Sequence, residues 1–350
     1  MLSTITYFEF AKADGTAGST GVVKFPLIIE NGALQNPFTP FTENTVIGQN
    51  GATVQYDRTF LAFNGSGSIA GAFADPAALG ALLNCIMGPS TPTAEGTVYR
   101  HTISGCQAAW PILIGERYST AATSTAQLVK AKVSSLTITA NRMDNKGTGG
   151  FLTLEVGYNF ASANYGVANP SLTLPNIAHA LRFSNATKYV SVAEFTPDGG
   201  ALTDLTPYLT TSTIEITRAL TDQNSTISTH PVAGIPDEAA YADIKVTGDL
   251  LCGQSNPNQP DQKFLAFLYG AASGTLPGTP ATPVTGTLHL KFLGGVTTDV
   301  SKYFTLDITG TVQFGGSWNP SGNTFSMACG FTSYPTIYVI NEVASYAQPT

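Results

Sequence analysis

Charged residues are scarce in this sequence. Only 11% of its 350 residues are Asp, Glu, Lys or Arg, against roughly 25% in an average soluble protein. Because Lys, Glu and Arg are good helix formers, their shortage disfavours a largely helical fold. The formal net charge is −7, which argues against a basic nucleic-acid clamp that would hold phosphates through Lys and Arg.

Cysteine motifs and long hydrophobic runs are also missing. Cys85, Cys106, Cys252 and Cys329 show no Cys-x-x-Cys spacing, so we expect reduced thiols in a protein that folds in the cytoplasm. A pair of disulfides is the less favoured alternative. No apolar run approaches the roughly 18 residues that span a membrane, and the first residues lack the pattern of a signal peptide.

Catalytic and metal-binding patterns are absent too. His101, His179, His230 and His289 lie far apart in the sequence and form no His-x-x-x-His or Glu-x-x-His pair, which disfavours a metal or catalytic site. The glycine-rich segment 65–71 lies within a predicted strand, where glycine relieves crowding or bends a sheet rather than cradling phosphate. We therefore expect no enzymatic activity, metal or cofactor.

Gly, Thr, Ser and Ala fill the place of the missing charges, a composition typical of a mainly β structural protein. Apolar and polar residues alternate in many short segments, which predicts strands with one face on a core. The first half has predicted strands at 7–10, 22–30, 67–73, 99–103, 110–117, 129–140 and 151–160. The second half has them at 189–195, 211–218, 242–251, 305–309 and 324–330.

The chain contains an internal repeat. Thr4–Gly15 and Lys188–Gly199 are both short apolar strands that end in Glu-Phe and lead to Asp-Gly. Each is followed by a second strand, a long polar loop (31–55 and 219–240), a return strand, a short helix (75–88 and 258–270) and a final pair of strands. Matched elements lie about 170–185 residues apart, which predicts two similar domains, 1–170 and 171–350.

The alternation puts a set of polar side chains opposite the core in the last strands of each half. In an ordinary protein they would form a solvated face, and the alternative is that they line an aqueous channel. The candidate channel residues are Thr137, Thr139, Thr153, Glu155, Thr305, Asp307, Thr309 and Ser326.

Both long loops are polar, contain prolines and occupy matching places in the two halves. Long loops in compact domains are usually functional, so we interpret them as arms that contact neighbouring subunits or rings; decorated surface loops are the alternative. The candidate contact residues are Pro37, Phe38, Pro40, Phe41, Glu43, Asn224, His230, Pro231, Pro236 and Asp237.

The first half resembles the tail tube proteins of long-tailed bacteriophages. The resemblance is carried by the order and spacing of Gly67–Gly71, Asp75–Leu83 with Gly88, Tyr99–Ile103, Trp110–Glu116 and Val133–Thr139. The second half is similar mainly through its match to the first, and it carries a Pro/Gly-rich insertion at 276–283.

The resemblance implies two tandem β-sandwich or barrel domains, each with one short flanking α-helix and a long inter-strand loop. It implies stacked rings of three chains that form a hollow tube in the virion tail, in contact with tape measure, terminator and tip proteins. Double-stranded DNA would pass through this tube without specific binding. A secreted or surface carbohydrate-binding, adhesive β-sandwich is the alternative function, and would predict a secretion signal or calcium ligands.

Overall fold

A computed structural model gives the structure of the chain. It describes residues 5–18, 24–28, 46–47, 53–54, 65–117, 121–141, 150–172, 179–183, 191–221, 237–238, 241–251, 284–295, 304–319 and 324–349. The loop residues Pro37, Phe38, Pro40, Phe41, Glu43, Asn224, His230, Pro231 and Pro236, the predicted helix 258–270 and Cys252 lie outside these ranges.

The described residues are mainly β, as the sequence predicted. The elements of the first half are β1 (Ile5–Phe10), β2 (Lys24–Ile28), β3 (Val46–Ile47), β4 (Thr53–Val54), β5 (Gly65–Phe73), α1 (Pro76–Met87), β6 (Thr91–Glu95), β7 (Val98–Ile103), β8 (Ile112–Arg117), β9 (Thr125–Asn141), β10 (Leu152–Phe160) and β11 (Ser162–Val167).

The second half supplies ten further strands. They are β12 (Val192–Pro197), β13 (Thr203–Asp204), β14 (Leu209–Thr217), β15 (Leu220–Thr221), β16 (Asp237–Glu238), β17 (Asp243–Leu251), β18 (Val284–Gly294), β19 (Phe304–Asn319), β20 (Thr324–Phe331) and β21 (Thr336–Asn341).

Strand pairing follows the same order in the two halves. In the first half, antiparallel neighbours run β1–β8–β9–β10–β5. In the second half they run β12–β18–β19–β20–β17. The long strands β9 and β19 have equivalent places, since each pairs along its first part with one neighbour (β8 or β18) and along its last part with another (β10 or β20).

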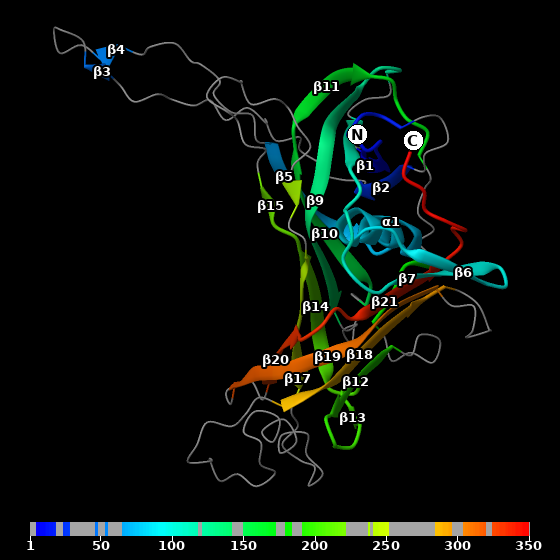
Figure 1. The fold of residues 1–350 in the computed structure, drawn as a ribbon, viewed down its shortest axis with the longest axis vertical. Coiled ribbons are helices and arrows are strands. Elements are labelled where there is room, and N and C mark those ends of the chain that lie inside the picture. The colour runs from blue at the N-terminus through cyan, green and yellow to red at the C-terminus, as the bar shows by residue number, and fades with distance from the viewer. Residues whose placement is uncertain are drawn as a thin grey trace.

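One sheet of 17 strands crosses from one half to the other. β9 pairs with β14, and β7 pairs with β21. Figure 1 shows β9 and β14 adjacent along the long axis of the molecule. A single cluster of buried apolar residues likewise includes Leu136 of the first half and Ile214 of the second. The division into domains 1–170 and 171–350 therefore remains a prediction from the repeated sequence.

α1 lies inside the fold. Asp75 caps it by accepting a hydrogen bond from the Ala78 amide at 3.1 Å, Pro76 is its first residue, and Gly88 ends it with a positive φ of 94°. The sequence prediction of this helix is confirmed. All twelve of its residues are buried, and it packs against β9, β19 and β21.

Glycines in β5 have the roles that the sequence predicted. A Cβ at Gly67 would lie 2.6 Å from the Tyr158 hydroxyl, so glycine leaves room for the tyrosine side chain of the neighbouring strand. Gly71 has a φ of 83° and lies at the irregularity where the register between β5 and β10 shifts. A left-handed residue of this kind is typical of a β-bulge.

The described cysteines are free thiols, namely Cys85, Cys106 and Cys329. Within the described ranges, no helix is long and apolar enough to cross a membrane.

Candidate functional site

The candidate site is the outward face of seven neighbouring strands, in the order β5–β10–β9–β14–β17–β20 and the last part of β19. We call it the polar face. Every neighbouring pair is antiparallel. At the centre, residues 135–141 of β9 pair with residues 211–217 of β14 without a register shift. The outward side chains of both halves therefore form one continuous surface.

Period-two alternation makes this surface. On β9, Leu136 and Ile138 are buried while Thr137 and Thr139 between them are partly exposed. On β14, Ile214 and Ile216 are buried and Glu215 is exposed. Hydroxyl, amide and glycine residues dominate the outward positions. They include Ser66, Ser68, Thr153, Gly157, Asn159, Ser135, Thr137, Thr139, Asn141, Thr211, Thr213, Thr217, Thr247, Thr324, Ser326, Ala328, Gly330, Thr311, Gln313 and Ser317.

Charged side chains on the polar face are few and mostly acidic. The outward positions of its described strands carry the acids Glu155, Glu215, Asp243 and Asp249 and the bases Lys132 and Lys245. They carry no arginine.

Lys245 is paired with an acid of the same face. The Lys245 ammonium lies 2.7 Å from the Asp243 carboxylate, and the hydrogen bond that it donates to this carboxylate, followed by the charge of Asp243, raises the pKa of Lys245. One row of cross-strand neighbours runs Glu155–Thr137–Glu215–Lys245, so that Thr137 has a glutamate on each side. The face therefore has a negative balance of charge and little attraction for phosphate.

A hollow of about 510 Å³ lies over β14, β17, β19 and β20. The Asp249 carboxylate within it accepts hydrogen bonds from the Thr211 hydroxyl at 3.1 Å and the Ser326 hydroxyl at 2.8 Å. The acid is thus held by neighbours on the same face, and the hollow is lined mainly by hydroxyl, glycine and small apolar residues.

Five of the eight predicted channel residues lie together on the polar face, and they are Thr137, Thr139, Thr153, Glu155 and Ser326. Thr305, Asp307 and Thr309 lie farther along β19, where its neighbours are β18 and β21.

The expectation that Thr305 and Asp307 face water is not met. Thr305 is 3% exposed and Asp307 is 2% exposed. Alternation put them opposite the core residues Leu306 and Ile308, but Asp307 is in contact with the side chains of His289 on β18 and Tyr338 on β21. Thr309 is partly exposed and donates a hydrogen bond to Asp307 at 3.3 Å.

The loop residues predicted to contact other subunits are outside the described residues, with one exception. Asp237 lies in β16, where it pairs with Thr221 of β15. Their role as intersubunit contacts stays a prediction.

Sequence reasoning missed the contribution of β14 and β17 to the polar face. Thr213, Glu215, Thr247 and Asp249 lie between the predicted residues of the two halves. The alternation of the segments 211–217 and 243–251 would have identified them as outward residues. Their position beside β9 follows only from tertiary pairing.

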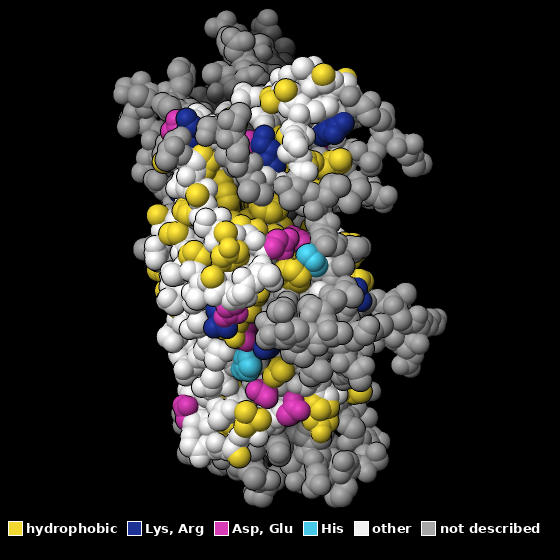
Figure 2. Space-filling view, turned by 90° about the vertical axis from the view of Figure 1, so that its right-hand side faces the viewer, with side chains coloured by type: hydrophobic (Ala, Val, Ile, Leu, Met, Phe, Trp, Pro, Cys, Tyr) yellow, Lys and Arg dark blue, Asp and Glu magenta, His cyan; other side chains and the backbone are white. Residues whose placement is uncertain are grey.

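Charge is also sparse on another face of the molecule. Figure 2 shows scattered acidic and basic side chains there, over a described surface that is mostly neutral. Among the described residues, no group of three or more His, Cys, Asp or Glu side chains could hold a metal ion.

Comparisons with known proteins returned no relatives. No protein-family model matches the chain, and a search of curated proteins found no similar sequence.

Proposed function

We propose that this protein polymerises as stacked rings into the hollow tail tube of a long-tailed bacteriophage, and that the polar face lines the channel through which DNA passes. The observation that carries the proposal is the continuity of this hydroxyl-rich, weakly acidic surface across both halves of the chain. The sequence resemblance to tail tube proteins supports the same function.

The chemistry of the polar face suits a channel for DNA. A conduit must let the duplex slide, and Lys or Arg contacts to phosphate would hold it instead. Hydroxyl groups keep the wall wetted, and Glu155 and Glu215 repel phosphates from it. Lys245 is engaged by Asp243, which weakens it as an anchor.

The repeated strand order supports a ring of three chains. Two units with the same pairing order in each chain would give six similar positions around a closed ring. The polar-face sheet ends at β5 on one side and, among the described strands, at residues 315–319 of β19 on the other, because β18 pairs with β19 as far as Phe314. Among the described strands, β5 forms ladder pairs only with β10. In a ring, pairing between the end strands of neighbouring copies would remove both edges.

Charge reversal on the polar face tests this function. We expect the double variant Glu155→Lys/Glu215→Lys to assemble into tubes and to retain short duplex DNA when the tubes are pelleted, while wild-type tubes leave the DNA in the supernatant. Two charges change sign where phosphates would pass, a net change of four units, so the variant gains electrostatic affinity that should fall steeply with added salt.

A matched control separates the channel wall from total charge. Asp204→Lys/Glu342→Lys makes the same change of charge at two exposed acids outside the polar face, and should leave the DNA in the supernatant. Equal retention by the control and the polar-face variant would contradict the assignment of the polar face as the channel wall.

A further inference from the structure

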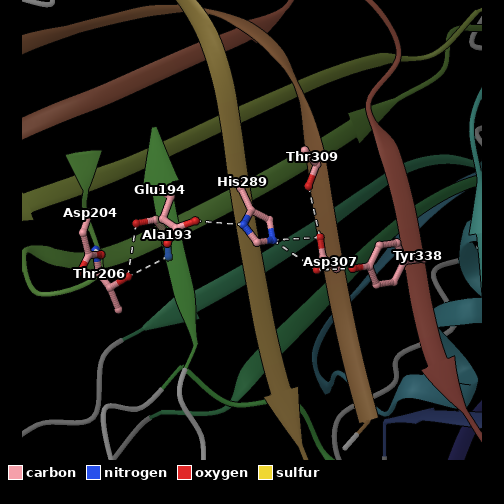
Figure 3. A network of polar contacts seen from close by, with 8 residues as sticks. All are labelled: Ala193, Glu194, Asp204, Thr206, His289, Asp307, Thr309 and Tyr338. Atoms are coloured by element: carbon pink, nitrogen blue, oxygen red, sulfur yellow. Dashed lines mark hydrogen bonds and ion pairs between the residues drawn. The ribbon is translucent and has the colours of Figure 1, made fainter. Parts of the chain in front are cut away.

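A second group of polar residues joins four strands of the other part of the sheet. We call it the His289 cluster, and it consists of Glu194 on β12, His289 on β18, Asp307 and Thr309 on β19, and Tyr338 on β21 (Figure 3). The sequence predicted neither β18 nor any contact of His289. The cluster takes no part in the polar face.

Both ring nitrogens of His289 face carboxylates. Nδ1 lies 3.3 Å from Glu194 Oε2, and Nε2 lies 3.2 Å from Asp307 Oδ1. Figure 3 shows the imidazole between the two acids, with β12 on one side and β19 on the other. An ionised carboxylate only accepts hydrogen bonds, so both contacts need an N–H group. A neutral imidazole has one N–H, whereas an imidazolium has two. The geometry therefore favours the protonated ring.

The burial of Asp307 also favours a positively charged His289. The Asp307 side chain is 2% exposed, against 30% for His289. A buried carboxylate is costly without a cation or several donors. Tyr338 donates to Asp307 Oδ2 at 2.6 Å, and Thr309 donates to Oδ1 at 3.3 Å. Because both donors are neutral, the negative charge of Asp307 has to be balanced by the nearby cations, His289 and Lys291.

The pKa directions agree with this geometry. The hydrogen bond to Asp307 raises the pKa of His289 more than burial lowers it, and the charges of Asp307 and Glu194 raise it further. Burial would raise the pKa of Asp307, but the hydrogen bonds from His289 and Tyr338 and the charges of His289 and Lys291 together hold it below its usual range.

The other charged groups around the cluster determine which of the two His289 contacts, to Asp307 or to Glu194, is weakened more by deprotonation. Lys291 is the direct cross-strand neighbour of Asp307. On the far side of Tyr338, Arg100 lies 5.0 Å from the tyrosine ring and is paired with Glu95.

Beyond β12, Asp204 is the cross-strand neighbour of Glu194 and adds another negative charge. When His289 loses its proton, Lys291 still faces Asp307, whereas Glu194 loses the cation that it contacts. Deprotonation of His289 therefore weakens mainly the attachment of β12, which carries Glu194.

We propose that His289 is a pH-sensitive latch: protonated, it ties β12 across β18 to β19, and its deprotonation loosens β12 and β13 at this end of the sheet. Since the folded protein holds this proton more tightly than the unfolded chain, the stabilisation is complete below the ordinary histidine pKa. It is lost as pH rises through the folded value. At strongly acidic pH it is also lost, because Asp307 becomes protonated.

Histidine side-chain NMR on the purified full-length chain tests the latch. We expect the His289 signals to titrate at a midpoint above about 6.5, with both ring nitrogens protonated below that midpoint. Asp307→Asn should lower this midpoint, and Glu194→Gln, at a more exposed position, should lower it by less. A His289 midpoint at or below the ordinary value would overturn the proposal.

Unfolding in urea at several pH values gives a second, independent test. His289→Gln should reduce the urea midpoint strongly near pH 6, and the difference from wild type should shrink toward pH 9. His179→Gln is the control, because His179 lies 3.6 Å from the Glu342 carboxylate but burial lowers its pKa; it should not show this trend.

A loss in His289→Gln that is the same at every pH would identify a merely structural residue and contradict the latch. If His289→Gln does not fold, Glu194→Gln replaces it and should flatten the pH dependence of the wild type. An unchanged pH dependence in Glu194→Gln would also contradict the latch.

Discussion

Gly80 occupies the middle of α1, where alanine would ordinarily stabilise a helix by about 1 kcal/mol. Here a Cβ would lie 2.5 Å from the Tyr346 hydroxyl oxygen and 3.0 Å from two ring carbons. The tyrosine is fixed in place, because its hydroxyl donates to Ala77 O at 2.6 Å and accepts from the Asn341 amide at 3.0 Å. Packing against the C-terminal segment thus overrides helix propensity at this position.

Gly80→Ala should therefore destabilise the protein, by about 1–3 kcal/mol as for other overpacked cores. Urea unfolding measures the change. Gly105→Ala is the control, since no atom lies within 4 Å of a Cβ there, and it should be close to neutral. In a Tyr346→Ala background, Gly80→Ala should become neutral or stabilising, and a persistent loss in that background would contradict the predicted clash.

The buried Asp75 carboxylate destabilises the folded protein when it is ionised, and this destabilisation grows as the pH rises. Burial and, to a smaller extent, the charge of Glu342 raise its pKa to about 6, although the hydrogen bond from the Ala78 amide acts in the opposite direction. Because the folded state binds this proton more tightly than the unfolded chain, stability falls as pH rises from about 4 to about 6.

Asp75→Asn keeps the cap and removes the charge, so it should stabilise the protein at pH 7 by up to about 2–3 kcal/mol and have little effect at pH 4. Thermal or urea unfolding at the two pH values checks this. A variant that is less stable than wild type at pH 7 would show that the cap needs the carboxylate.

At the scale of elements, β9 joins two parts of the sheet and bends between them. Its residues 125–131 pair with β8, and residues 132–140 pair with β10. Lys130, just before the change of partner, has a φ of 54°, and the left-handed conformation costs a residue with a side chain roughly 1–2 kcal/mol. The bend is therefore imposed by the two sheet pairings rather than by local preference.

Lys130→Gly should consequently be neutral or slightly stabilising, although glycine within a strand normally costs about 0.5–1 kcal/mol. Lys132→Gly, two residues along in extended backbone, is the matched comparison, and it should lose the full stability that glycine within a strand costs. Urea midpoints of the two variants decide the matter, and a larger loss for Lys130→Gly would refute the account of the bend.

Local sequence signals predicted some elements and not their partners. Asp75, Pro76 and Gly88 specified α1 correctly, because capping depends on neighbours in sequence. Alternation likewise predicted the faces of β9 and β10. β18 was missed, although it carries His289.

The pairing of β9 with β14 and the burial of Asp307 could not be predicted, for one reason. Period-two alternation says which way a side chain points, but not which strand lies beside it. The continuity of the polar face and the composition of the His289 cluster both depend on such nonlocal pairings.

At the scale of the whole molecule, the order of strand pairing can be compared with the repeat that the sequence predicts. The strand order recurs in both halves, yet the sheet and the core run through the middle of the chain. Within the chain, β9 pairs with β14. We propose a similar pairing between the end strands of neighbouring copies. Three chains would then close a ring with the polar face on one side throughout.

Cryo-electron microscopy of the purified, assembled protein tests this central claim most directly. The account predicts tubes built of stacked rings, three chains to a ring, with Thr137, Glu155 and Glu215 facing an open channel. Stable monomers at high protein concentration, or an assembly in which these three residues face outward, would contradict it.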